Sequence, residues 1–234
     1  MNTNSRKKSR MRKGRLKIMR EIIHPELSRF DAAIRAQGAA LLAGVDEAGR
    51  GPLAGSVFAA AVILPDGLDI PYLNDSKKIT EKRREQLFDV ICASACAYGI
   101  GEATVEEIEQ INILNAAMLA MKRAIAALKD LSGQPVHPDL ALIDGNTARG
   151  FDLPVQCVVG GDAKSASIAA ASVLAKVSRD RSMRLLAEQY PMYGFEQHKG
   201  YGTAQHYAAI DQFGPLPVHR LSFLKKHTDA KREA

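Results

Sequence analysis

The sequence predicts an α/β protein in which helices flank a mixed sheet and a small helical segment follows at the C-terminal end. Strand-like apolar runs come first and then alternate with helical stretches, which favours helices packed on a sheet. Beyond Pro191 no strand pattern remains, so the end of the chain is expected to add helices and loops only.

Apolar runs of strand length predict the sheet. A turn rich in glycine and proline at 49–55 separates the first two runs, and Pro65, Asp66 and Gly67 end the second. The expected strands cover residues 41–47, 56–64, 98–103, 139–144 and 154–159.

Helices are expected where apolar residues recur at a spacing of three or four. Thr104 and Glu107 form a capping box, which predicts the start of a short helix. A later helix is expected to end at Ser132-Gly133, and a long alanine-rich helix ends before Pro191. Helical segments are thus expected from 80, from 104, over 114–131, from about 164 to 190, and near 203–212.

The 234 residues fit one ordinary domain with a small appendage. Hydrophobic residues make up 46% and charged residues 25%, so the chain can bury a core. No apolar run approaches the length of a membrane helix, so we expect no membrane partner. Cys92, Cys96 and Cys157 form neither a CxxC motif nor a Cys/His ligand pattern, and we expect reduced thiols in a cytoplasmic protein, with Cys92 and Cys96 in the core.

The net charge of +6 is concentrated at the N-terminus, where residues 1–20 hold nine Lys or Arg and no acid. Like charges repel and little apolar area is available, so a disordered tail is expected. Three interpretations stay open: a solubility tail, an arm that binds phosphates without sequence preference, or an import presequence.

Carboxylates follow three of the apolar runs. Asp46 and Glu47 end the first strand, Asp144 ends the fourth, and Asp162 follows the fifth after two glycines. Each acid alone is equally well explained as a turn residue or a helix cap. If the three strands are neighbours, however, all four carboxylates meet in the crevice where open α/β sheets bind ligands.

Converging carboxylates repel one another and are costly to bury. Hard divalent cations, Mg²⁺ or Mn²⁺, are the usual remedy, and two such ions on shared carboxylates form a site for phosphoryl transfer. The run from Gly160 to Ser165 is not a Walker A loop, because Ala163 stands where the second glycine is required.

Five distinctive sequence blocks follow one another along the chain: GVDEAGRGPLAGSV (44–57), LNDSKKITEKRR (73–84), ALIDGN (141–146), VVGGDAKSASIAAASVLAKVSRD (158–180) and YGFEQHKGYGT (193–203). With these blocks in this order, the chain resembles bacterial ribonuclease HII from about Leu42 to Phe223.

The resemblance implies a ribonuclease H-like fold and a metal site made by Asp46, Glu47, Asp144 and Asp162, the acids that also follow the strands. It implies a basic tail over 1–25, a catalytic domain over 26–190, and a helical and loop segment over 191–234 that completes the substrate groove. A basic extension of 20 residues is the main departure from the family.

The family pattern also implies substrate-binding residues. Backbone groups of Gly49, Arg50 and Gly51 are expected to read the 2′-hydroxyl, which distinguishes RNA from DNA. Tyr201 matches a tyrosine that packs on the sugar at an RNA–DNA junction; its alternative role is a core or hinge aromatic. The expected phosphate contacts are Lys77, Ser172 and Lys176, for which a solvated surface role is the alternative.

The implied function is an endonuclease that hydrolyses the RNA strand of RNA–DNA hybrids. It also nicks 5′ of single ribonucleotides in duplex DNA, leaves a 3′-hydroxyl and a 5′-phosphate, and uses two Mn²⁺ or Mg²⁺ ions. A cytoplasmic monomer in ribonucleotide excision repair is expected. Two alternatives remain: a related metal-dependent nuclease or resolvase, and a noncatalytic hybrid-binding protein.

Overall fold

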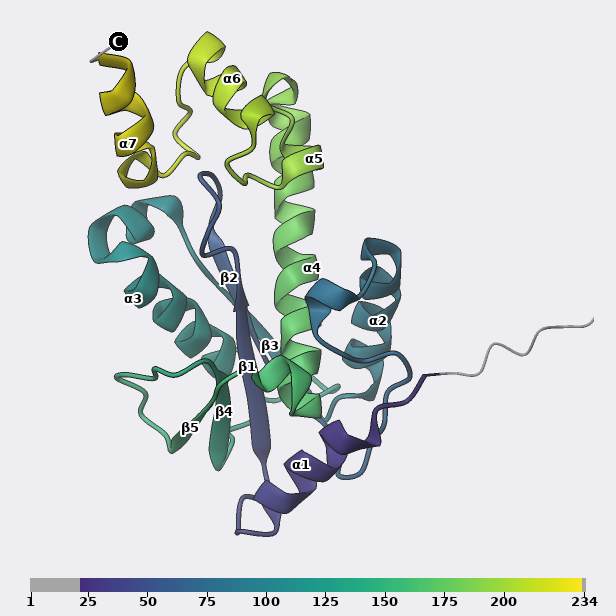
Figure 1. Cartoon of the computed structure of the whole chain (residues 1–234). Helices are drawn as coiled ribbons and strands as arrows, with labels where there is room; N and C mark the ends of the chain where they lie inside the picture. The colour runs from purple at the N-terminus through teal and green to yellow at the C-terminus, as the bar shows by residue number, and fades with distance from the viewer. Residues whose placement is uncertain (1–21, 233–234) are drawn as a thin grey trace, which may run out of the picture.

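The computed structural model describes residues 22–232; residues 1–21, 233 and 234 lie outside the described part. Its sheet has the order β3-β2-β1-β4-β5 (Figure 1). β1 pairs antiparallel with β2 and parallel with β4, so the sheet is mixed, as predicted. The strands are β1 Leu42–Ala48, β2 Val57–Ile63, β3 Ala97–Ala103, β4 Leu140–Asp144 and β5 Val155–Val158.

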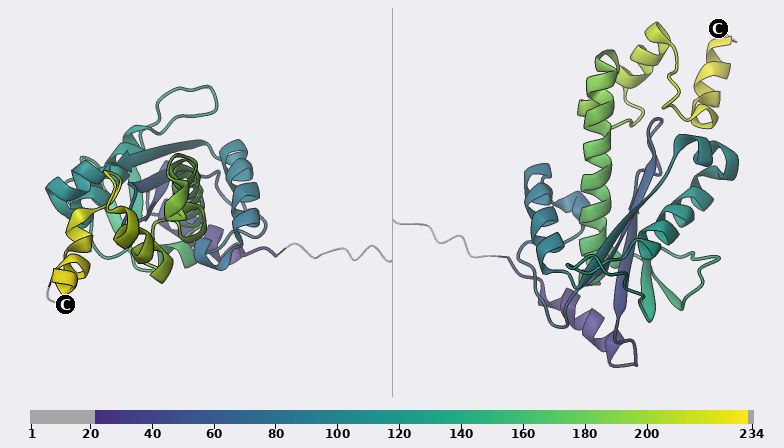
Figure 2. Two further views of the ribbon diagram at one scale, coloured as in Figure 1. Left: turned by 90° about the horizontal axis from the view of Figure 1, so that it is seen from above. Right: turned by 180° about the vertical axis from the view of Figure 1, so that it is seen from behind.

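Helices cover both faces of the sheet, with α4 (Ala166–Gln189) on one face and α3 (Val105–Ala126) on the other (Figure 2). α2 (Glu81–Ser94) packs beside α4, and the 3₁₀ turn η1 (Ser76–Lys78) precedes it. Gly44 of β1 lies so close to α4 that a Cβ there would sit 2.1 Å from the carbonyl carbon of Ser167. Small residues on the sheet thus let α4 pack directly against β1.

The chain beyond Pro191 folds into short helices at the far end of α4 (Figure 1). This C-terminal segment shares an apolar core with Leu53 and Ala54 of the β1–β2 turn and with Met183 of α4. It therefore closes over the turn that follows β1. Its elements are η3 Pro191–Tyr193, α5 Phe195–His198, α6 Ala204–Phe213 and α7 Leu221–Arg232; the helix predicted near 203–212 is confirmed, and α7 was not predicted.

α3 contains both helical segments expected on either side of residue 112. The capping box of Thr104 and Glu107 is present at its start. Asn112 breaks the helix with φ 64° and ψ 164°, and its side chain accepts hydrogen bonds from the amides of Leu114 and Asn115. The predicted end at 131 is wrong, because the chain leaves the helix after Ala126 and Lys129 forms backbone hydrogen bonds with Tyr98 of β3.

The N-terminal part adds α1 (Pro25–Arg35), which the sequence patterns did not predict. Of the expected tail over 1–25, residues 22–25 are described, and the carbonyl of Ile22 accepts a hydrogen bond from the amide of Tyr72. The remainder of that tail, including all nine of its basic residues, lies outside the described residues.

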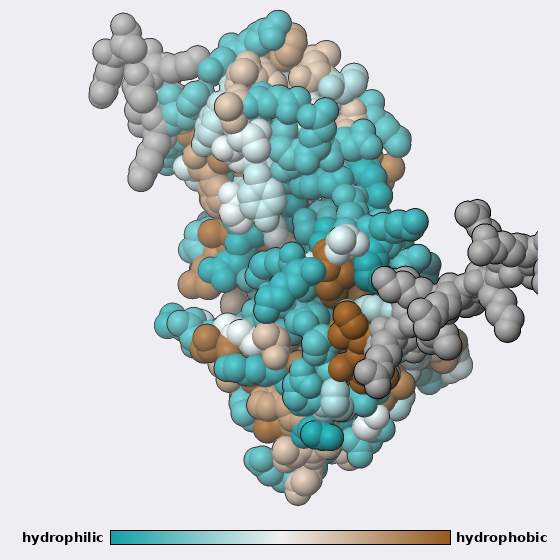
Figure 3. Space-filling view, turned by 45° about the vertical axis from the view of Figure 1, so that its right-hand side comes forward, coloured by the Kyte–Doolittle hydropathy of each residue, from teal (hydrophilic) through white to brown (hydrophobic). Residues whose placement is uncertain are grey.

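Two smaller expectations concern the cysteines and the surface. Cys92 is half-buried and packs against the apolar core between the sheet and α4. Cys96 is exposed, so its assignment to the core is wrong; it lies after the end of α2, just before β3. No helix among residues 22–232 is long and apolar enough to cross a membrane. Hydrophilic residues predominate on the face shown in Figure 3, where hydrophobic residues form only small patches.

Candidate active site

The carboxyl ends of the three parallel strands meet at one edge of the sheet. β1 pairs with β4 at Val45 and Ile143, and β4 pairs with β5 at Asp144 and Val158. The three strands β1, β4 and β5 are therefore neighbours, which is the condition under which the sequence predicted that the four acids meet. This arrangement brings together the strand ends at which Asp46, Glu47 and Asp144 lie, and Asp162 follows β5 in the next turn.

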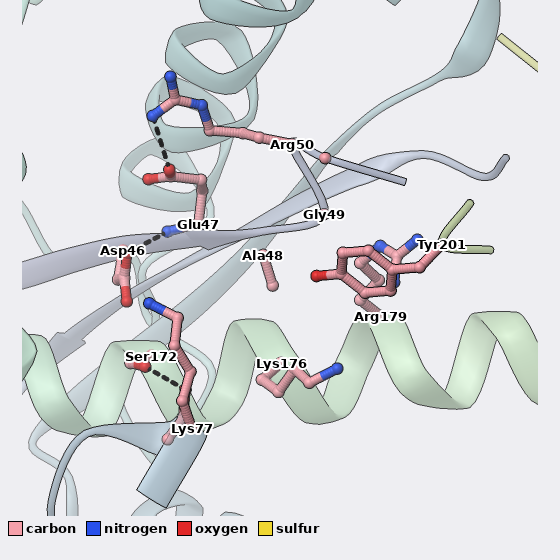
Figure 4. A pocket seen from close by; sticks show the side chains of 12 residues that line it. Asp46, Glu47, Ala48, Gly49, Arg50, Lys77, Ser172, Lys176, Arg179 and Tyr201 are labelled. Carbon is pink, nitrogen blue, oxygen red and sulfur yellow. Dashed lines mark hydrogen bonds and ion pairs between the residues drawn. The ribbon is translucent and has the colours of Figure 1, made fainter. Parts of the chain in front are cut away.

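Asp46 is the most enclosed acid at this edge, with 6% of its surface exposed. Its carboxylate accepts a hydrogen bond of 2.7 Å from the amide of Glu47 and points toward the Lys77 side of the pocket (Figure 4). Burial raises the pKa of Asp46 well above its usual value, and the nearby charges of Glu47 and Asp144 raise it further. A positive charge nearby would therefore stabilise the ionised form of this carboxylate.

Glu47 points to the opposite side of β1, because successive side chains of a strand alternate (Figure 4). Its Oε1 lies 3.3 Å from Nη1 of Arg50. Burial raises the pKa of Glu47, the positive charge of Arg50 opposes that change, and the charge of Asp144 adds to it. The charge of Glu47 is thus stabilised by the Arg50 cation and destabilised by the negative charge of Asp144.

Asp144 and Asp162 are joined through the loop after β5. Oδ1 of Asp144 accepts a hydrogen bond of 2.6 Å from the amide of Gly161, which precedes Asp162 in the 3₁₀ turn η2 (Gly161–Ala163). Gly160 enters this turn with φ 63°, a conformation that suits glycine. Burial raises the pKa of Asp162, and the charges of Asp75 and Asp144 raise it further.

The donor chemistry of these four acids fits a hard divalent cation. All four supply carboxylate oxygens, and the repulsion among Asp46, Glu47, Asp144 and Asp162 is the kind that such a cation relieves. Within residues 22–232, no group of three or more His, Cys, Asp or Glu side chains lies close enough together to hold a metal ion as the side chains stand. The fit therefore concerns ligand type and charge.

A pocket of about 230 Å³ extends from Asp46 and Glu47 along α4 (Figure 4). All seven residues predicted to bind substrate line it, together with Asp46 and Glu47, whereas Asp144 and Asp162 lie outside its lining. The lining residues are Asp46, Glu47, Ala48, Gly49, Arg50, Gly51, Ser76, Lys77, Ser172, Lys176, Arg179 and Tyr201.

Among the polar side chains that line the pocket, those of Lys176 and Ser172 have partners, whereas Nε and Nη1 of buried Arg179 have no hydrogen-bond partner in the described part of the chain. The Nζ of Lys176 lies 2.6 Å from a carboxylate oxygen of Asp180, and the hydroxyl of buried Ser172 donates to that of Ser76 at 2.6 Å. Lys77 is exposed; burial lowers its pKa, but the charges of Asp162 and Asp46 outweigh this and the pKa is raised. Lys77 therefore stays cationic beside the acids.

Comparison with known protein families shows to which family the chain belongs. The family model described as Ribonuclease HII matches residues 43–226. The chain belongs to the ribonuclease HII family. A ribonuclease HII of Endomicrobium trichonymphae is 53% identical over 195 residues, which cover 83% of this chain and 90% of that protein. As a member of this family, the chain is a ribonuclease H-type hydrolase that acts on RNA–DNA.

Solved structures share the fold of this ribonuclease HII chain at low identity. Ribonuclease H2 from Pyrococcus horikoshii superimposes with a TM-score of 0.64 at 23% identity, covering 82% of this chain and 99% of that one. Bst-RNase HIII in complex with Mn²⁺ gives a TM-score of 0.59 at 17% identity, covering 78% of this chain and 65% of that one. These likenesses show the ribonuclease H-like sheet with its flanking helices.

Several residues of this ribonuclease HII site were not identified from the sequence. Asp31 of α1 accepts hydrogen bonds from the side chains of Ser165 and Ser167, so it fastens the start of α4 beside the Asp162 turn. No local pattern marks this contact, because 134 residues separate Asp31 from Ser165. Asp75 precedes η1, accepts from the amide of Lys77, and places a fifth carboxylate near Asp162.

Buried arginines were missed for the same reason. Arg179, 1% exposed, lies beneath Gly49, where a Cβ would meet its Nε at 2.2 Å. Arg220 is fully buried and donates hydrogen bonds to carbonyl oxygens of the β1–β2 turn. A count of charges treats every arginine alike, whereas these two are buried and donate hydrogen bonds to backbone carbonyls of the turn between β1 and β2.

Proposed function

We propose that this protein is an endonuclease that hydrolyses the RNA strand of RNA–DNA hybrids and nicks duplex DNA on the 5′ side of single embedded ribonucleotides. The products carry a 3′-hydroxyl and a 5′-phosphate. The observation that carries the proposal is one pocket in which Asp46 and Glu47 of β1 adjoin the Gly49–Gly51 loop and Tyr201. The chemistry and the selection of the sugar can therefore act on the same nucleotide.

Asp46, Glu47, Asp144 and Asp162 are the residues that would hold divalent metal, either Mg²⁺ or Mn²⁺. Their oxygen donors and mutual repulsion support this assignment, and the Bst-RNase HIII neighbour was solved with Mn²⁺. Two such ions, when bound, supply an activated water and stabilise the leaving oxygen of an in-line displacement. The carboxylates contribute the negative charge that keeps the ions at the strand ends.

The loop over Gly49–Gly51 and the ring of Tyr201 would select the ribose. A Cβ placed on Gly51 would lie 3.6 Å from Cε1 of Tyr201, so the loop and the ring face each other across a short gap. Glycine lets a sugar approach the backbone closely, and backbone groups can then test for the 2′-hydroxyl. Tyr201 is 46% exposed, which suits a ring that packs on a bound sugar.

Cations around the pocket would bind the phosphates of the substrate. Lys77 is exposed beside the acids, and Lys176 lines the same pocket from α4. Ser172 contributes a hydroxyl that is now donated to Ser76. Such contacts fix the register of the duplex without reading its sequence. The proposed setting is a cytoplasmic monomer that serves ribonucleotide excision repair.

A labelled DNA duplex with one ribonucleotide tests the proposal. The protein is incubated with it in Mg²⁺, in Mn²⁺ and in EDTA, beside an all-DNA duplex and a long RNA–DNA hybrid. We expect a metal-dependent nick 5′ of the ribonucleotide and no cleavage of all-DNA. Cleavage of the RNA–DNA hybrid alone would refute the proposed activity on single ribonucleotides. Cleavage of the all-DNA duplex would favour a different nuclease. Binding of the hybrid without any cleavage would favour a noncatalytic protein.

A further inference from the structure

The Gly49–Gly51 side of the pocket is held by a buried arginine from the C-terminal segment. Nη2 of Arg220 donates to the carbonyl of Gly49 at 2.7 Å and to that of Gly55 at 2.6 Å, and Nη1 donates to the carbonyl of Arg50 at 3.0 Å. Arg220 is 0% exposed, and no ion pair within the described part of the chain includes it. Its charge is therefore directed at the carbonyls of the loop.

The Tyr201 side is held by a relay that starts at the preceding residue, His219. Nδ1 of His219 accepts from the amide of Leu216 at 2.9 Å, so its Nε2 must carry the proton that is shared with Nε2 of His206 at 3.1 Å. Nδ1 of His206 then donates to the carbonyl of Tyr201 at 2.9 Å. Both rings are buried, and one pair of neutral tautomers satisfies every bond.

Backbone contacts make this connection rigid. Ala54 and His219 form an antiparallel bridge, and the amide of Arg220 donates to the carbonyl of Leu53 at 2.7 Å. The amide of Leu53 donates to the carbonyl of Gly200, the neighbour of Tyr201, at 2.8 Å. The two loops are therefore joined through the His219–Arg220 dipeptide.

We propose that His219 and Arg220 are positioning residues that set the spacing between the Gly49–Gly51 loop and Tyr201, and through it the selection of a ribonucleotide over a deoxyribonucleotide. This inference rests on the proposed function. The planar guanidinium fixes several carbonyls at once, which a single ammonium group cannot do. Hydrogen bonds from the backbone to the 2′-hydroxyl depend on the directions of the carbonyl and amide groups. If the Gly49–Gly51 loop is held less firmly, the protein should therefore lose its preference for a ribonucleotide before it loses metal binding.

Two sets of variants separate positioning from general stability. Arg220→Gln removes the fork of donors, with Arg35→Gln as the matched control, because Arg35 also donates to a backbone carbonyl, that of Leu64, far from the site. His206→Asn retains a donor near the position of Nδ1, whereas His206→Leu removes it. The measurements are kcat/KM on the single-ribonucleotide duplex, the ratio of Kd values for all-DNA and single-ribonucleotide duplexes, and Mn²⁺ affinity by calorimetry.

We expect Arg220→Gln and His206→Leu each to reduce kcat/KM and the Kd ratio by about tenfold, the equivalent of about 1.4 kcal/mol, with Mn²⁺ affinity unchanged. Arg35→Gln should match the wild type, and His206→Asn should restore most of the loss. Unchanged Kd ratios in folded variants would overturn the inference, and the His206 pair decides it if Arg220→Gln does not fold. A wild type without any ribonucleotide preference would instead refute the proposed function.

Discussion

The carboxylates at the strand ends and the proposed sugar-selecting side of the pocket differ in how their residues are held. Asp46, Glu47 and Asp144 belong to paired strands, and Asp162 follows the next strand, so the sheet itself places the acids. The Gly49–Gly51 loop and Tyr201 are instead held by side chains from the C-terminal segment. Under the proposed function, the chemistry would therefore depend on the sheet, whereas selection would depend on contacts made by the last part of the chain.

The largest expected effect is on the carboxylate side. Asp46→Asn should reduce kcat by about a thousand-fold or more, because metal stabilisation is worth several kcal/mol and each ~1.4 kcal/mol is tenfold in rate. The variant should fold, and its metal-free form should be at least as stable as the wild type, since burial disfavours the charged carboxylate. A near-normal cleavage rate of Asp46→Asn in single-turnover experiments would contradict the assignment of Asp46 as a metal ligand.

A smaller effect is expected on the selecting side. Tyr201→Ala should lower kcat/KM for a single embedded ribonucleotide by roughly tenfold, the loss expected for one aromatic contact. The ring is 46% exposed, so thermal stability and Mn²⁺ affinity should change little. Tyr201→Phe retains the ring and is the matched control. Equal activity of all three proteins would assign Tyr201 a role outside selection.

The docked C-terminal segment should respond to pH. Burial lowers the pKa of His206 to about 4, and it also lowers those of His198 and His219. Unfolded histidines titrate near 6.5, so the unfolded chain binds more protons between these values. The free energy of unfolding should therefore fall as the pH drops from about 6.5 to about 4.

Urea unfolding of the wild type and of His206→Asn at pH 7 and pH 4.5 measures this contribution. The wild type should lose more stability than the variant over that interval, because the variant lacks one of the titrating rings. Comparing the two proteins removes the contribution of the acids they share. An identical loss in both would show that His206 does not contribute.

The smallest effect concerns the basic tail. Deleting residues 1–20 should make binding of the duplex less sensitive to salt, with the slope of log K against log salt shrinking by about 0.9 for each phosphate that the tail neutralises. Metal affinity and kcat should not change. An unaltered slope in fluorescence anisotropy titrations would leave the tail a solubility element.

Much of the carboxylate side could be predicted from the sequence, because an acid after an apolar run is a local signal. The strands that carry Asp46 and Asp144 appear in the structure within one residue of their predicted bounds. The positions of the Gly-Arg-Gly loop and Tyr201 required the family resemblance. Their roles in binding, like those of the acids in holding metal, stay predictions.

The supports of these loops could not be predicted, because the partners lie far apart in the chain. Arg220 and Gly49 are 171 residues apart, and the scattered histidines showed no motif before folding brought His206 to His219. The Cys96 prediction failed for a related reason: helical spacing identifies a shared face, but only the packing shows whether a helix still continues at that residue.

The binding preference of Asp46→Asn decides whether the two sides of the pocket act separately. Its affinity for a duplex with one ribonucleotide is measured against its affinity for the matching all-DNA duplex, beside the wild type in EDTA. The variant should no longer cleave but should keep the preference of the wild type within about threefold, less than the ~1.4 kcal/mol of a tenfold change. If the variant loses the preference together with cleavage, the two sides do not act separately.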